Sequence, residues 1–194
     1  TARNGVWKLG PGKNFFRVVK KELPHLQIVA EDLGAVTDKV VSLLEFCGYP
    51  GMKVLSFAFS GNPADPHLPQ NYHENSVVYT GTHDNSTVMG WLKGASERDR
   101  HMAFKILGIT EQDNFAKAMV RAAMLSGADT CVLPMQDILE LPDSARMNIP
   151  STIGGINWRW RMLEGQADTK LAGRLKSLNI LAGRGMTNPE NSTK

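Results

Sequence analysis

The sequence is poor in the features that mark secreted, membrane and nucleic-acid-binding proteins. It has only two cysteines, Cys47 and Cys131, in separate apolar segments, which predicts buried free thiols in a reducing compartment rather than a disulfide framework. No stretch approaches the roughly 20 apolar residues of a membrane span, and no charged-then-apolar leader opens the chain. The net charge is only +3, without a dense run of Lys and Arg. We therefore expect neither a membrane nor a nucleic-acid partner.

The chain also lacks an initiator methionine. Residues 1–12 contain four asparagine or glycine positions and a proline in a loop-like pattern, and a domain seldom begins inside such a connection. With 42% apolar and 21% charged residues, the remainder has the composition of a globular protein that can bury a sizeable core. We therefore expect a piece of a longer globular chain.

Apolar runs and helical spacing alternate along the sequence. Short apolar runs predict four strands, at 27–30, 51–59, 76–80 and 130–134. Helical patterns follow Gly12, Thr37 and Asn85. Two more follow capping-box sequences at 96–99 and 110–113, and a last one includes residues 171–178. Strands alternating with helices predict an α/β fold with parallel pairing. Four parallel strands alone would expose long edges, so we expect half of a larger sheet or barrel.

Acidic residues follow two of the predicted strands. Glu31 and Asp32 come after the first, and His83 and Asp84 after the third. Because the carboxyl ends of parallel strands face one rim, these groups can converge on a single site. A carboxyl pair suits glycosidic-bond chemistry, in which one acid protonates the leaving oxygen and a carboxylate stabilises the positive sugar carbon. The alternatives are solvated loop carboxylates at the first position and a helix cap at Asp84.

No cluster of His, Cys, Asp and Glu has the spacing of metal ligands, and the chemistry above requires neither a metal nor a cofactor. We expect Phe57 and Phe59, on one face of a strand, to lie in the core. Trp158 and Trp160 could form a platform for a sugar ring, but core positions are the expected ones.

Six blocks of the sequence, in order between residues 6 and 162, resemble those of the 4-α-glucanotransferases, also called amylomaltases or disproportionating enzymes, in the α-amylase-like superfamily. They are Ala30–Gly34, Pro50–Phe59, Tyr79–Asn85, Pro134–Leu139, Ala145–Asn148 and Asn157–Arg161.

This resemblance implies the carboxyl-terminal half of a (β/α)8 TIM barrel, strands five to eight with their helices, over residues 1–182, followed by a polar tail over 183–194. It implies that Glu31 is the general acid/base and that Asp84 stabilises the transition state. His83 would bind sugar hydroxyls, and Asp32 and Asn157 would contact sugar as well. The implied reaction transfers an α-1,4-glucan segment to the 4-hydroxyl of an acceptor glucan by a retaining double displacement, in the cytoplasm or, in a plant or alga, in a plastid.

The family's nucleophile, an aspartate two residues beyond an arginine, does not occur before Glu31. A retaining mechanism needs that carboxylate about 5 Å from the acid/base, so these residues alone should not turn over without the missing amino-terminal half. Two alternatives stay open. One is a non-catalytic chain that at most binds glucan, and the other is a hydrolase of the same superfamily.

Overall fold

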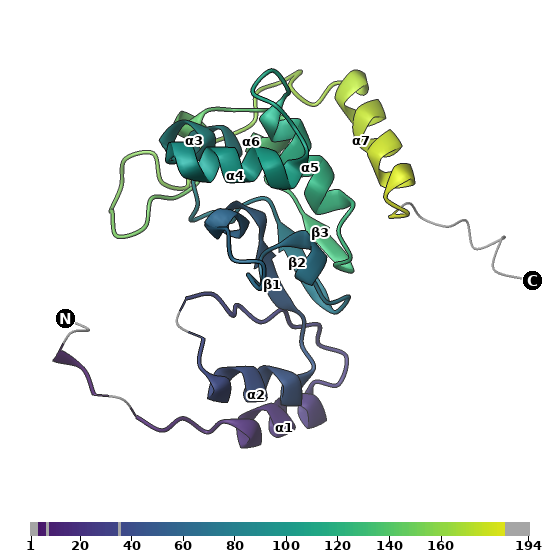
Figure 1. The fold of residues 1–194 in the computed structure, drawn as a ribbon. Helices are drawn as coiled ribbons and strands as arrows, with labels where there is room; N and C mark the ends of the chain where they lie inside the picture. The colour runs from purple at the N-terminus through teal and green to yellow at the C-terminus, as the bar shows by residue number, and fades with distance from the viewer. Residues whose placement is uncertain (1–3, 7, 35, 185–194) are drawn as a thin grey trace, which may run out of the picture. The chain divides into compact units, whose positions relative to one another are not determined.

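The computed structural model describes residues 4–6, 8–34 and 36–184, which belong to two compact units, Thr1–Met52 and Lys53–Lys194 (Figure 1). Within these ranges, no helix combines the length and the apolar character needed to cross a membrane.

The first unit contains two helices, α1 (Lys13–Glu22) and α2 (Asp38–Cys47), which pack against each other. Gly48, in the left-handed conformation at φ 64°, ends α2 as the sequence predicts. The Phe46 ring of α2 receives the cationic groups of α1, with Lys13 Nζ 5.1 Å from its centroid. The contact between the two helices therefore includes charged side chains of α1 over an aromatic ring of α2, and is not a purely apolar core.

The strand predicted over 27–30 is wrong, because the described chain has no strand there. The segment is extended, and Ala30 donates one backbone hydrogen bond to the Pro50 carbonyl, at 2.9 Å. A strand requires a ladder of such bonds to a neighbour. The sheet of the described residues contains only three other segments, so an apolar run has no partner here with which to form one.

That sheet has the order β1-β2-β3, with β1 at Gly51–Val54, β2 at Ser76–Tyr79 and β3 at Thr130–Val132. β2 and β3 run parallel, with Val78 opposite Cys131. The sequence predicted these three strands, but the first ends early, because Leu55–Ser60 form the 3-10 helix η2. Leu55 and Ala58, three residues apart and both fully buried, share one face of a 3-10 turn, which a strand would not allow.

The longer helices of the second unit begin at capped positions. They are α3 (Val88–Gly94), α4 (Glu97–Leu107), α5 (Phe115–Met124) and α7 (Thr169–Leu181). Ser96 accepts a hydrogen bond from the Asp99 N–H, which confirms the helix start predicted at the first of the two capping-box sequences. The second is wrong as a helix start, because Asp113 binds Thr110 in a turn and Asn114 caps α5.

Three shorter elements complete the second unit. These are η3 (Pro69–Asn71), α6 (Met135–Ile138) and η4 (Asp143–Ala145). Pro134 precedes α6 and has no N–H to donate to a ladder, which explains why β3 ends before the predicted boundary at 134.

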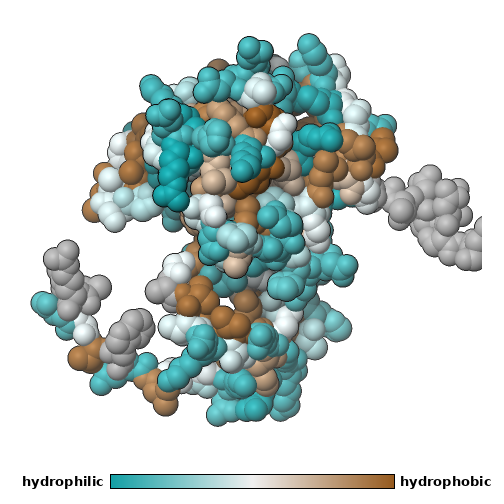
Figure 2. Space-filling view, in the orientation of Figure 1, coloured by the Kyte–Doolittle hydropathy of each residue, from teal (hydrophilic) through white to brown (hydrophobic). Residues whose placement is uncertain are grey.

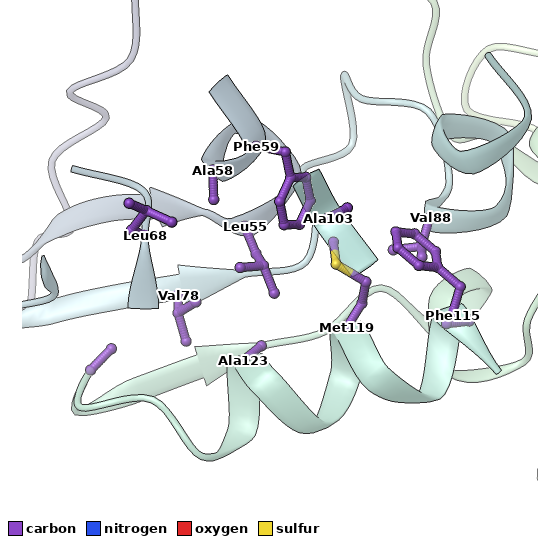
Figure 3. Close-up of a cluster of buried hydrophobic side chains, with 12 residues drawn as sticks. Leu55, Ala58, Phe59, Leu68, Val78, Val88, Ala103, Phe115, Met119 and Ala123 are labelled. Carbon is purple, nitrogen blue, oxygen red and sulfur yellow. The ribbon is translucent and has the colours of Figure 1, made fainter. Parts of the chain in front are cut away.

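The hydrophobic core lies between η2, the sheet and the helices α4 and α5 (Figure 3). Figure 3 shows Met119 and Ala123 of α5 directed toward Leu55, and all three are fully buried. The Trp91 and Phe115 rings stack at 5.6 Å. Phe59 is buried as predicted. Phe57 is 44% exposed, so its predicted core position is wrong.

Arg184 joins the connection between α5 and β3 to the end of α7. Its guanidinium group donates hydrogen bonds to four carbonyl oxygens, at distances of 2.6 to 3.0 Å, those of Met124, Ser126, Ala128 and Asp129. A permanently charged fork thereby satisfies carbonyls that have no helical partner. Cys131 lies in β3 nearby, and burial raises the pKa of its thiol to about 11 against the opposing charge of Arg184. Both cysteines are free thiols, as predicted, although Cys131 is only half-buried.

The surface carries polar and apolar residues intermixed, and Figure 2 shows apolar residues over α7. This helix buries none of its residues, and Ile180 and Leu181 are 67% and 60% exposed.

Candidate active site

His83 and Asp84 lie in the loop that follows the carboxyl end of β2. The Asn85 side chain accepts hydrogen bonds from the Thr82 N–H and hydroxyl, at 2.7 and 2.9 Å, and so closes a tight turn around the pair. The side chains of His83 and Asp84 are 54% and 48% exposed. Because β2 is parallel to β3, the pair occupies the kind of strand end that carries chemistry in parallel α/β proteins.

One carboxylate oxygen of Asp84 is held and the other is open. Oδ1 accepts a hydrogen bond from the Asn148 amide at 2.6 Å and lies 3.4 Å from His83 Nε2. Oδ2 has no hydrogen-bond partner within the described part of the chain. An oriented carboxylate with one open oxygen can bind a sugar hydroxyl or stabilise a developing positive charge.

Arg146, on the segment after η4, reaches the same loop. Its guanidinium group donates to the carbonyl oxygen of Asp84 at 2.6 Å and to the Ser86 hydroxyl at 3.1 Å. Its Nε donates to the carbonyl oxygen of Asn148 at 2.7 Å. In the sequence, Arg146 stood out only as part of the resembling block Ala145–Asn148, and nothing there predicted its contact with the loop that carries Asp84.

Trp158 borders the pair, and its predicted core position is wrong. Its side chain is 55% exposed, and its ring lies 5.2 Å from that of His83 at an interplanar angle of 39°. Its backbone has φ 62°, uncommon for a non-glycine residue, and its N–H donates to the Met147 carbonyl at 2.7 Å. This loop conformation keeps the indole out of the core. Trp160 is half-buried.

Asn157 braces the loop before Trp158. Its side-chain oxygen accepts the Ile149 N–H at 2.9 Å, and its amide donates to the Thr152 hydroxyl at 2.9 Å. These bonds occupy the polar atoms that a sugar would use. The role of Asn157 as a sugar ligand stays a prediction.

Glu31 and Asp32 belong to the first unit. Glu31 is exposed on the extended segment. Asp32 is half-buried, and its Oδ1 accepts the Met52 N–H at 2.7 Å. A Cβ at Gly51 would lie 2.5 Å from Asp32 Oδ2, so glycine is required for this close approach. The structure thus brings His83 and Asp84 together with residues 146–158. Their convergence with Glu31 stays a prediction.

Asp137 is a residue whose importance sequence reasoning missed. It is 2% exposed in α6, where its oxygens accept the Thr80 hydroxyl at 2.5 Å and the Val88 N–H at 2.8 Å. Burial raises the pKa of this carboxyl, and the two hydrogen bonds oppose that shift. Asp137 therefore ties the end of β2 to the start of α3, on both sides of the loop that carries His83 and Asp84. The available signal was the acidic residue itself, directly before the apolar pair Ile138 and Leu139.

Among the residues the structure describes, no group of three or more His, Cys, Asp and Glu side chains is placed to hold a metal ion.

The fold of the chain is similar to that of solved amylomaltases. An amylomaltase from Streptococcus agalactiae, solved in complex with acarbose, matches 95% of this chain and 37% of its own length, with a TM-score of 0.89 and 33% identity. An amylomaltase from Corynebacterium glutamicum, 16% identical, shares the fold with a TM-score of 0.60. The mixed α/β architecture with a small parallel sheet is thus that of the amylomaltases.

The sequence comparison is more specific. A family profile described as 4-alpha-glucanotransferase matches residues 1–166. The chloroplastic/amyloplastic 4-alpha-glucanotransferase DPE1 of Arabidopsis thaliana is 45% identical over 93% of this chain and 32% of its own length. The 4-alpha-glucanotransferase of Thermus thermophilus is 40% identical over 92% and 37%. The chain belongs to the 4-alpha-glucanotransferase family, as the resembling blocks predicted, and spans about a third of the length of these relatives.

Proposed function

We propose that these residues are the carboxyl-terminal part of the catalytic (β/α)8 barrel of a 4-alpha-glucanotransferase. Residues 1–182 would supply strands five to eight with their helices, and 183–194 would follow as a tail. The segment 27–30, which is extended here with one backbone bond from Ala30 to Pro50, would pair as the first of these strands only in the complete barrel. The family membership and the partial coverage of the relatives support this assignment. The observation that carries the proposal is the His83–Asp84 pair at a strand end, with one oxygen of Asp84 held and the other open.

In the proposed reaction, Glu31 gives its proton to the glycosidic oxygen of a donor α-1,4-glucan as the bond from that oxygen to C1 breaks. A nucleophilic aspartate, expected outside these 194 residues, forms the glycosyl ester at C1. The 4-hydroxyl of the acceptor glucan then gives its proton to Glu31, its oxygen attacks C1, and the aspartate leaves. Asp84 stabilises the positive charge at C1 in both steps, and His83 binds sugar hydroxyls.

The remaining predicted contacts follow from position. Asp32 lies beside Glu31 and keeps one oxygen, Oδ2, outside its bond to Met52, where it would meet a donor sugar. The exposed indole of Trp158 beside His83 offers a flat apolar face to a glucose ring. This is the sugar-platform alternative, which a buried Trp158 would have excluded. Asn157 would contact sugar at the edge of this loop. The relatives' names indicate bacterial and plastid enzymes, and we propose a cytoplasmic or plastid location for this one.

Glucose release from maltotriose by the full-length protein tests the assignment. Glu31→Gln and Asp84→Asn should each lower kcat by about 10² to 10⁴. The exposed residues Glu45 and Asp38 of α2 supply matched controls, Glu45→Gln and Asp38→Asn, which should keep full activity. Near-normal turnover of either site variant would overturn its role.

Residues 1–194 by themselves should release no glucose, because the nucleophile is absent from this sequence. Turnover by these residues alone would contradict the two-carboxylate mechanism proposed here. The proportions of transferred and hydrolysed products in the full-length protein separate a transferase from a hydrolase.

A further inference from the structure

We propose that Arg146 and Asn148 form a positioning clamp that sets the orientation of the Asp84 carboxylate in the transition state. The inference rests on the function proposed above, because it assumes that Asp84 acts in the reaction. It concerns the segment Ala145–Asn148, which the sequence showed as a resembling block without a role.

The clamp joins two loops that are about 60 residues apart in sequence. From Arg146, hydrogen bonds run to the carbonyl oxygen of Asp84 and to the Ser86 hydroxyl, with separations of 62 and 60 residues. From Asn148, the backbone N–H donates to the His83 carbonyl at 3.1 Å, and the side-chain amide donates to Asp84 Oδ1 at 2.6 Å. Four bonds from two residues thus fix the backbone on both sides of Asp84 and its side chain as well.

Arg146 is itself held in place. Its side chain is only 17% exposed, and Asp143 Oδ2 lies 3.8 Å from its Nη1. The Nε bond to the Asn148 carbonyl links the two clamp residues directly. Because the guanidinium group is planar and stays charged, it can serve several acceptors in a fixed geometry that a lysine cannot reproduce.

The clamp is anchored to the core through Asp143. Its Oδ1 accepts the Thr87 N–H at 3.0 Å, at the start of α3. A Cβ on Gly90 would overlap this carboxylate, so α3 and the segment 143–148 meet at a position where only glycine fits. The orientation of Asp84 is therefore tied to a helix that packs on the buried core rather than to an exposed loop alone.

The chemical consequence follows from which oxygen is held. The Asn148 amide is a donor that holds Oδ1, so it selects the side-chain rotation that leaves Oδ2 open. The charged or titratable groups at this carboxylate within the described residues are His83, 3.4 Å from Oδ1, and Arg146 at the Asp84 carbonyl. Without the amide, a side chain that is 48% exposed would sample other rotations, and misplacement of about 1 Å can cost about a hundredfold in rate.

The test uses the full-length protein and two variants, Asn148→Ala and Arg146→Lys. Each should lower kcat for maltotriose disproportionation by about 10- to 100-fold and change KM by less than about threefold, because the clamp acts on the transition state. Asn179→Ala in α7 and Arg121→Lys in α5 are matched controls, because neither side chain has a hydrogen-bond partner in the part of the chain that the structure describes. Circular dichroism at the assay temperature confirms that each variant is folded.

A double-mutant cycle with Asp84→Asn separates positioning from general destabilisation. If Asn148 acts through Asp84, adding Asn148→Ala to Asp84→Asn should lower kcat by less than about twofold further. Should Asn148→Ala not fold, Arg146→Lys carries the same cycle, because it keeps the charge and most of the volume. A wild-type kcat in both clamp variants would overturn the clamp. So would a double variant whose loss in kcat is the product of the losses in the clamp variant and in Asp84→Asn. An active Asp84→Asn protein would instead refute the proposed role of Asp84 and remove the basis of the clamp.

Discussion

The two compact units differ most in what their elements bury. In the first, of the apolar side chains within residues 4–6, 8–34 and 36–52, only that of Cys47 is buried, and α1 buries none of its residues. In the second, Leu55, Val78 and Met119 are fully buried in one continuous core. Each unit carries one of the two carboxylates assigned to catalysis. Glu31 lies on an extended segment with a single backbone bond at Ala30, whereas Asp84 is fixed by a network of side chains.

This difference indicates that residues 53–184 set the geometry at Asp84 by themselves. A carboxylate loop tied to a packed core keeps its orientation because moving it would disturb many contacts at once. The segment around Glu31 has no such connection to a packed core among its own described neighbours, and its bonds there are those from Ala30 to Pro50 and from Met52 to Asp32.

The largest test of the comparison is a pair of identical substitutions, one in each unit. Leu55→Ala removes a fully buried side chain and should lower the free energy of unfolding by about 2 to 5 kcal/mol. Leu26→Ala removes a side chain that is 53% exposed and should cost less than about 1 kcal/mol. Urea denaturation of the 194-residue chain, followed by circular dichroism, measures both. Equal losses would mean that the units do not differ in packing as described.

A second test addresses the anchor of the clamp in the second unit. Gly90→Ala puts a methyl group against the Asp143 carboxylate and should cost about 1 to 3 kcal/mol, because the helix and η4 must separate. Gly94→Ala, at the end of the same helix, meets nothing within 4 Å and serves as the control. If both variants unfold at the same urea concentration, α3 and η4 are not in the close contact described.

The third test uses pH. Because burial raises the pKa of Asp137, its contribution to stability is fully present below the unfolded pKa and is lost as pH rises through the folded pKa. Asp137→Asn removes this titration. The stability of the parent relative to the variant should therefore be greatest at low pH and decline as pH rises. Urea midpoints measured from pH 4 to pH 8 provide the comparison. A midpoint of the parent that rises relative to that of the variant as pH increases would contradict the assigned burial.

The smallest effect is expected in α7, which resembles α1 in that it buries no residue although it belongs to the second unit. Gly173 lies within this helix with open space around its Cα. Gly173→Ala should stabilise the chain by roughly 0.5 to 1 kcal/mol through helix propensity. A thermal melt that shows a lower midpoint would indicate that α7 makes a close contact at this position.

The sequence allowed much of the second unit to be predicted. Alternating apolar runs and helical spacing gave the parallel strands, and Ser96 gave a helix start, because these signals are local. The position of His83 and Asp84 after a strand followed from the same pattern. The strand at 27–30 failed because a strand depends on a partner elsewhere in the chain, which its own residues do not encode.

The errors at the site have a similar cause. Trp158 was expected in the core, but its left-handed backbone, with a bond from its N–H to Met147, is a property of the loop. Asp137 stood in the sequence only within the resembling block Pro134–Leu139, and its burial depends on donors 57 and 49 residues away, at Thr80 and Val88. Arg146 likewise gave no local signal, because the carbonyl that it binds lies 62 residues earlier.

Arg184 also affects the order in which the second unit can form during synthesis. The four carbonyls that it binds lie 55 to 60 residues before it. They leave the ribosome while Arg184 has not yet been translated, and they must remain hydrated during that interval. The passage from α5 into β3 therefore reaches its final state only after α7 has emerged and packed on α5. In the growing chain, all residues of the sheet and of its covering helix are therefore synthesised before the residue that fixes the turn between them.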